Sequence, residues 1–271
     1  MDAMWKTLHK LIQLDTPVPF NNNKYLGCTQ VDVEPDMTQV AEKTQLYSEL
    51  ERTNLKYHEA TAETSVDSPT APPKKRKHKI PVQTNSGKTG TAEAGAQKKP
   101  AFKVKAWEYR MCGSITSAVD RYLELSNVKR DSLKKVSTPC IDDHLIPAED
   151  FTTKGHLSAQ ASKIVLKALY AARLARPDLL WTVNALAREV TKWTIACDKR
   201  LHRLMSYMVN TPEHVLRSHL GDELKDCKLY MFVDASFAGD LTDSKSTSGM
   251  ILCLCGPNTF CPLSWLCKKQ G

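Results

Sequence analysis

The chain has 271 residues, with 38 Lys and Arg against 30 Asp and Glu, and a formal net charge of +8. Its 41% hydrophobic and 25% charged residues are typical of a globular protein of one or two domains. No run of about 18 apolar residues occurs, and the first 14 residues lack the unbroken apolar stretch of a signal peptide. We therefore expect no contact with a membrane, a location in the cytoplasm or the nucleus, and, from the basic charge, a polyanion such as nucleic acid as partner.

The nine cysteines are an odd number without the spacing of a secreted disulfide framework, which predicts reduced thiols. Four of them lie close together in the sequence: Cys253, Cys255, Cys261 and Cys267. Their spacing does not fit a zinc knuckle, and alternation along strands would bury them. Core thiols are therefore favoured over a zinc site.

The N-terminal part begins with apolar residues at helical spacing, which predict a short amphipathic helix over residues 4–12 that Pro17 and Pro19 end. Residues 24–29 have the pattern of a short strand that contains a glycine. Residues 31–60 are polar and rather acidic, with the pattern of a helix over residues 39–50.

Residues 61–100 are rich in Thr, Ala, Pro, Lys, Ser and Gly and nearly free of large apolar side chains. Such a segment cannot bury enough surface to offset the entropy of ordering it, so we expect disorder. It contains Lys74, Lys75, Arg76 and Lys77, a run typical of a nuclear import signal or of a charge contact with a polyanion. A solvated charge run in a linker explains it equally well.

Helices dominate the next part. An apolar stripe predicts a helix over residues 111–122, followed by a loop with Pro139 and Pro147. Three helices are then expected at about residues 157–175, 178–191 and 194–209, with Asp178 as the N-cap of the second. The outer face of the third is basic, which suits either solvent or a nucleic-acid backbone: Lys199, Arg200, His202 and Arg203.

The pattern then changes to three short apolar runs, at residues 229–233, 249–255 and 260–266, with a turn at Gly256-Pro257-Asn258. Short apolar runs joined by loops predict an antiparallel three-stranded meander. Three strands make a poor fold unless helices cover them.

Several blocks around these strands resemble one family in order and spacing. They are Phe-Val-Asp-Ala-Ser-Phe-Ala-Gly-Asp at 232–240, Ser-Lys-Ser-Thr-Ser-Gly at 244–249, Leu-Ser-Trp at 263–265 and Lys-Lys-Gln at 268–270. Together they resemble the opening of the ribonuclease H domain in Pol polyproteins of copia-type retrotransposons.

Flanking segments are similar to the same family. Arg176-Pro177-Asp178 resembles its junction between two helices, and Tyr25-Leu26-Gly27-Cys28 resembles its Leu-Gly strand near the end of the polymerase palm. The resemblance covers residues 157–271 well and about the first 30 only weakly.

The resemblance implies an α+β chain that is a truncated piece of such a polyprotein. We expect the end of a reverse transcriptase palm-like segment at 1–30, a polar acidic segment at 31–60 and a disordered basic linker at 61–100. A helical thumb or connection segment at 101–225 would precede an incomplete three-stranded ribonuclease H-like sheet at 226–271.

A ribonuclease H cleaves the RNA strand of an RNA–DNA hybrid with two Mg²⁺ ions held by four carboxylates. Asp234 matches the first of these carboxylates and is the candidate catalytic residue and metal ligand. A capping Asp at a strand end is the alternative, which the surrounding blocks disfavour. The other three carboxylates would follow Lys268-Lys269-Gln270, so we expect neither stable Mg²⁺ binding nor cleavage by this chain alone.

The segment Cys140-Ile141-Asp142-Asp143 imitates the aromatic-x-Asp-Asp hairpin of a polymerase site. It follows Leu26-Gly27, where the family order requires it to precede them, and it lacks the aromatic residue. An exposed acidic turn is therefore the favoured interpretation.

The sequence thus predicts a fragment of a polyprotein whose parent performs RNA-directed DNA synthesis and cleaves RNA–DNA hybrids. The alternative is a non-catalytic nucleic-acid-binding or interaction protein derived from the element. The expected partners are an RNA–DNA hybrid or another nucleic acid, and an importer if the basic run is read as a nuclear signal.

Overall fold

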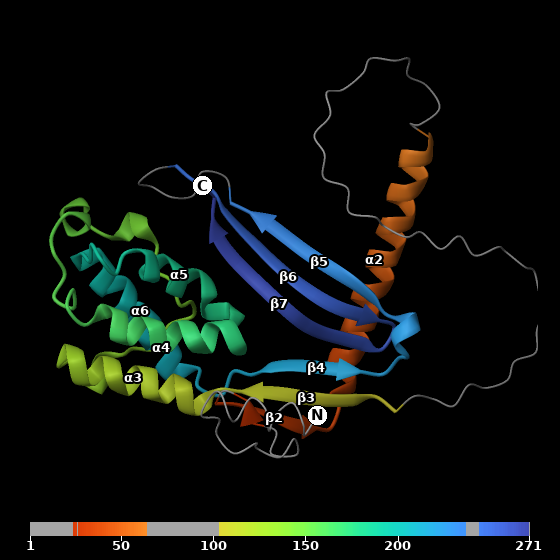
Figure 1. Ribbon diagram of the computed structural model, residues 1–271, viewed down its shortest axis with the longest axis horizontal. Coiled ribbons are helices and arrows are strands. Elements are labelled where there is room, and N and C mark those ends of the chain that lie inside the picture. The colour runs from red at the N-terminus through yellow and green to blue at the C-terminus, as the bar shows by residue number, and fades with distance from the viewer. Residues whose placement is uncertain (1–23, 26, 64–102, 237–243, 271) are drawn as a thin grey trace, which may run out of the picture.

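The computed structural model describes residues 24–25, 27–63, 103–236 and 244–270. Figure 1 shows a helical unit beside a long curved sheet, with helix α2 crossing the sheet at the end away from that unit. The predicted helix at 4–12 and the basic run Lys74 to Lys77 lie outside the described residues. Of the helices within them, none is long and apolar enough to cross a membrane.

The sheet has seven strands in the order β1-β2-β3-β4-β7-β6-β5, and all neighbours are antiparallel. Their bounds are Lys24–Tyr25, Cys28–Val33, Lys105–Arg110, Leu216–Leu220, Lys228–Ala235, Thr247–Gly256 and Thr259–Lys269 for β1 to β7. Strands β5, β6 and β7 confirm the predicted meander. The prediction that the sheet has only three strands was wrong, because β4 pairs with β7 and extends the sheet.

The junction between β4 and β7 is short but supported by side chains. His219 of β4 pairs with Phe260 of β7, and their rings lie 6.5 Å apart. The Cys261 thiol donates to the carbonyl oxygen of His219 at 3.3 Å, and the Thr259 hydroxyl accepts from the Gly221 amide at 3.2 Å. Strands from both sides of the expected boundary at 225/226 therefore form one sheet, although the proposed division into segments stays a prediction.

The expected strand at 24–29 is a hairpin in the structure. Gly27 has φ +77° between β1 and β2, a backbone conformation that favours glycine. Helix α2, Met37–Glu63, follows, and the Asp36 carboxylate caps it by accepting from the amides of Thr38 and Gln39. This helix is longer than the expected 39–50, since helix-forming Glu, Leu, Lys and Ala residues continue the pattern. Its last three residues fall in the segment expected to be disordered.

Four helices form the helical unit and confirm the predicted pattern. They are α3 (Cys112–Ser126), α4 (Ala161–Leu174), α5 (Leu180–Arg188) and α6 (Ile195–Asn210). Their apolar faces form one core, whose fully buried members include Ile115, Val119, Ile164, Val165, Val183, Leu186, Leu201 and Met205. The loop with Pro139 and Pro147 contains short 3₁₀ turns at Asp143–Leu145 and Ala148–Phe151.

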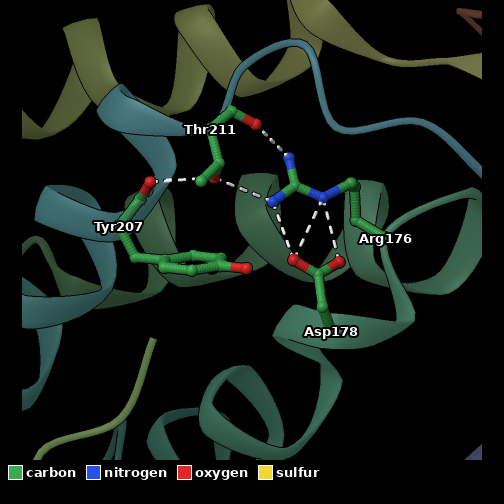
Figure 2. Close-up of polar contacts among 4 residues, drawn as sticks. All are labelled: Arg176, Asp178, Tyr207 and Thr211. Atoms are coloured by element: carbon green, nitrogen blue, oxygen red, sulfur yellow. Dashed lines mark hydrogen bonds and ion pairs between the residues drawn. The ribbon is translucent and has the colours of Figure 1, made fainter. Parts of the chain in front are cut away.

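Arg176 lies at the point where three helices of this unit meet (Figure 2). Its guanidinium is 2% exposed and binds both carboxylate oxygens of Asp178, with Nε to Oδ1 at 2.9 Å and Nη2 to Oδ2 at 2.8 Å. It also donates to the carbonyl and hydroxyl oxygens of Thr211, just after α6, at 2.8 and 3.0 Å. Asp178 was expected to cap the second helix; instead it lies within a 3₁₀ turn, Pro177–Leu179, and pairs with Arg176.

Replacing Arg176 should strongly destabilise the protein. Arg176→Met keeps much of the side-chain volume but leaves the Asp178 carboxylate and the Thr211 carbonyl without their donor, at a cost of roughly 2–4 kcal/mol. Urea unfolding followed by circular dichroism measures the loss. The matched control Arg173→Met changes an exposed arginine on α4 and should stay within about 0.5 kcal/mol. Equal losses in the two variants would contradict the role of Arg176.

Glu108 forms a second buried ionic contact, in the sheet. It is 5% exposed, and its carboxylate accepts from Arg110 on the same strand at 2.8 Å and from Arg217 on β4 at 2.7 Å. Burial alone would raise the pKa of this carboxyl, but the hydrogen bonds from Arg110 and Arg217 outweigh it and hold the pKa below its ordinary value. Glu108 thus has hydrogen-bond donors from both β3 and β4. Neither of these strands has the apolar alternation that predicts a strand from sequence.

This contact should make stability depend on pH on the acid side. Because the pKa of Glu108 is lower in the folded chain, its contribution is present above about pH 4 and is lost as the pH falls through the folded value. Thermal unfolding of wild type and Glu108→Gln between about pH 3 and 6 tests this. The variant should be less stable near pH 6 by roughly 1 kcal/mol, because the two arginines are half exposed, and the difference should shrink toward pH 3. A difference independent of pH would contradict it.

Candidate functional site

Asp234 is the seventh residue of β5, near the end of that strand. Its side chain is exposed, and its Oδ1 accepts from the Ala235 amide at 2.9 Å. The residue opposite it on β6 is Gly249, where an added Cβ would meet only the backbone oxygen of Asp234, at 3.8 Å. The pairing of β5 with β6 therefore holds this exposed carboxylate opposite a residue that has no side chain.

The structure brings the predicted blocks together at this end of the sheet. The Ser236 amide donates to the carbonyl oxygen of Thr247, and the Ser236 hydroxyl accepts from the Thr247 amide, each at 3.0 Å. Gln270 donates from its amide to the Ser246 oxygen at 2.8 Å and from its side chain to the Ser248 hydroxyl at 2.7 Å. Three blocks that are separate in the sequence thus form the surroundings of Asp234.

The geometry around Asp234 leaves its metal role a prediction. Within the ranges the structure covers, no group of three or more His, Cys, Asp or Glu could hold a metal ion. Asp240 and Asp243 lie outside the described residues. One exposed carboxylate has the hard oxygen donors that Mg²⁺ prefers, but it supplies only one corner of a two-ion site.

Two hydrogen bonds attach this end of β7 to the helical unit. The indole Nε1 of Trp265 donates to the carbonyl oxygen of Ala172 at 2.9 Å, in the last turn of α4, where helix carbonyls lack partners. The side-chain amide of Asn184 on α5 donates to the carbonyl oxygen of Cys267 at 2.9 Å. The Leu-Ser-Trp block therefore fixes the position of the sheet relative to α4 and α5.

Beside this attachment lies a groove of about 900 Å³ between the helical unit and the sheet. The sheet contributes Ser236, Thr247 and Lys269 to its lining, and α5 contributes Trp181, Ala185 and Arg188. The segment Cys140 to Asp143 lines it too, as the expected acidic turn: Asp142 accepts from the His144 amide, and Asp143 pairs with Arg200 at 2.6 Å. No aromatic-x-Asp-Asp hairpin is formed by these residues.

The basic face of α6 was left open between solvent and nucleic acid. In the structure it holds the long loop before α4. Arg200 pairs with Asp143, Lys199 pairs with Asp150, and Arg203 donates to the Thr138 oxygen at 3.0 Å. His202 bonds the Tyr122 hydroxyl at 2.9 Å. The sequence pattern could not show this, because the acidic partners lie some 50 residues away.

Comparison with known proteins tests the predicted resemblance to Pol polyproteins. A stretch of 95 residues, 35% of this chain, is 37% identical to the retrovirus-related Pol polyprotein from transposon RE2 of Arabidopsis thaliana. The corresponding polyprotein from transposon RE1 of the same plant is 36% identical over 95 residues. The matched stretch spans 6% of the length of these relatives. No family model matches the chain, and no solved structure gives a significant match.

This stretch is related to retrotransposon Pol polyproteins. The predicted resemblance to copia-type Pol is thereby confirmed over about a third of the chain. The names of these relatives specify neither a ribonuclease H domain nor a reverse transcriptase, so both assignments are proposals.

The four clustered cysteines are placed as expected for core thiols. Cys253, Cys255 and Cys261 are buried, and Cys267 is half-buried. Burial raises the pKa of the Cys261 thiol to about 11, so this thiol stays protonated and is a poor metal ligand near neutral pH.

One functional candidate escaped the sequence analysis. Trp181 is 47% exposed in the groove, although tryptophan is usually mostly buried. The signal was present: the inward face of the predicted helix held Leu179, Val183 and Leu186, so Trp181 had to lie on the outer face. Lys74 to Lys77, the other candidate binding residues, lie outside the described ranges, and their role stays a prediction.

Trp265 should stabilise the sheet through its indole nitrogen. Trp265→Phe keeps an aromatic six-membered ring but removes the indole N–H and leaves the Ala172 carbonyl unpaired, which should cost about 1 kcal/mol in thermal unfolding. Trp107→Phe is the matched control, since it removes a 2.8 Å bond to the Tyr109 hydroxyl, which can rotate toward another partner. A loss in Trp265→Phe no larger than in the control would contradict this role.

Proposed function

We propose that this chain provides the junction between the thumb helices and the ribonuclease H domain of a retrotransposon Pol polyprotein, and that Asp234 is one of the carboxylates that bind Mg²⁺ there. The match to two Pol polyproteins carries the proposal. The placement of Asp234 supports it, since the family blocks meet around this residue at one end of the sheet.

Asp234 suits the role of a metal ligand in three respects. It is exposed, it projects from a strand paired along its length with β6, and its Oδ1 is oriented by the Ala235 amide. When bound by a complete set of carboxylates, a Mg²⁺ pair activates water and stabilises the leaving oxygen of the cut RNA strand. Asp234 would contribute negative charge and one or two oxygens to that set.

The rest of the chain would position this ligand. Trp265 and Asn184 attach β7 to the helices, and Ser236 and Thr247 close the loop end of β5 and β6. Since one carboxylate cannot hold two ions, we expect the 271-residue chain alone not to cleave an RNA–DNA hybrid. Hybrid cleavage would belong to the longer polyprotein.

A chimeric polyprotein tests the proposal. Residues 157–271 of this chain would replace the corresponding segment of the Pol polyprotein of transposon RE2, and the purified chimera would be incubated with a labelled RNA–DNA hybrid and Mg²⁺. Asp234→Asn keeps the shape but removes the charge, and should reduce cleavage more than about a hundredfold.

Asp226→Asn is the matched control, because Asp226 is an exposed aspartate just before β5. It should cleave as the parent chimera does. Full cleavage by Asp234→Asn in an active chimera would refute the assignment, and cleavage by the isolated 271-residue chain would refute its expected inactivity.

A further inference from the structure

We propose that the groove between the helical unit and the Asp234 end of the sheet binds one strand of nucleic acid, with Trp181 stacking on a base and Arg188 and Lys192 contacting phosphates. This proposal rests on the proposed function only for the direction in which the bound strand runs, which is toward the Asp234 site. Binding itself does not depend on a metal site.

The size and position of the groove favour a single strand. Its volume of about 900 Å³ is at the upper end of small-molecule sites, enough for a few nucleotides and too small for a duplex. It is bounded by α5 and the segment after it, by the loop at residues 140–158 and by the ends of β6 and β7. A strand can lie along such a trough with its backbone at the rim.

Trp181 supplies the flat surface that such a strand needs. It belongs to α5, and Trp181, Ala185 and Arg188 follow each other at intervals of four and three residues, on one face of the helix. Ala185 leaves room beside the indole. An exposed aromatic ring next to a cation is the arrangement on which bases of any sequence stack.

The charges of the lining favour a polyanion. Five cationic side chains line the groove: Lys154, Arg188, Lys192, Arg200 and Lys269. Three carboxylates accompany them: Asp142, Asp143 and Glu189. Asp143 is paired with Arg200, and Lys154, Arg188 and Lys192 are exposed. An acidic peptide would meet the same charges but would not use the indole face, so nucleic acid fits the combination better.

The groove also ends beside the proposed metal ligand. Ser236, which lines it, is two residues after Asp234, and Thr247, bonded to Ser236, lines it too. A strand held on Trp181 would therefore extend toward the Asp234 end of the sheet. The groove would position a nucleic-acid strand for the site that the longer polyprotein completes.

The test is binding of a fluorescein-labelled oligo-dT of about 12 nucleotides to the 271-residue chain, followed by fluorescence anisotropy at several salt concentrations. Wild type should bind with an affinity that falls as salt rises. Trp181→Ala should weaken binding about tenfold, and Trp181→Phe should restore most of it. Arg188→Ala and Lys192→Ala should weaken binding and flatten its salt dependence.

Arg52→Ala is the matched control, since Arg52 is exposed on α2 outside the groove. Its binding should equal that of wild type. Binding is measured without Mg²⁺, which separates this inference from the metal assignment. Circular dichroism would show that each variant is folded.

Three results would overturn the inference. One is a folded Trp181→Ala variant that binds the oligonucleotide as wild type does. The second is tighter binding of a duplex of the same length than of the single strand. The third is an oligo-glutamate peptide of the same charge competing as well as unlabelled oligo-dT.

Discussion

The arrangement of the helical unit depends on one buried charge, the guanidinium of Arg176. It lies where α4 ends, α5 begins and α6 ends, and it binds Asp178 and Thr211 (Figure 2). A buried cation is tolerated only when it is paired and fully hydrogen-bonded, so these three helix ends are held in one geometry. The site depends on that geometry, since α4 receives Trp265 and α5 carries both Asn184 and Trp181.

A second constraint is that the two faces of the sheet are covered differently along β5. Along β5, Lys228 and Tyr230 bond Glu51 of α2, whereas the alternate residues Leu229, Met231 and Val233 are exposed. Strand β5 is also the edge of the sheet. An apolar face on an edge strand is prone to association.

The features that suggest a function lie at the Asp234 end of the sheet. A stretch of the chain is similar to retrotransposon Pol polyproteins, and β7, which carries the Leu-Ser-Trp block, contacts α5. A carboxylate on a strand end and a groove with an aromatic and several cations lie side by side there. The carboxylate suits a metal-dependent cleavage of nucleic acid, and the groove suits binding of a nucleic-acid strand.

The sequence by itself determined the helices of residues 112–210, the β5–β6–β7 meander, the buried cysteines and the similarity to Pol polyproteins over about a third of the chain, because each depends on local periodicity or on neighbouring residues. It could not show β3 and β4, whose polar residues become satisfied only when Glu108 meets Arg217, 109 positions away. Nor could it place Trp181 in a groove or assign the basic residues of α6 to a loop. Only the tertiary structure decided these, since the free energy of a buried charge or an exposed ring depends on partners brought together by folding.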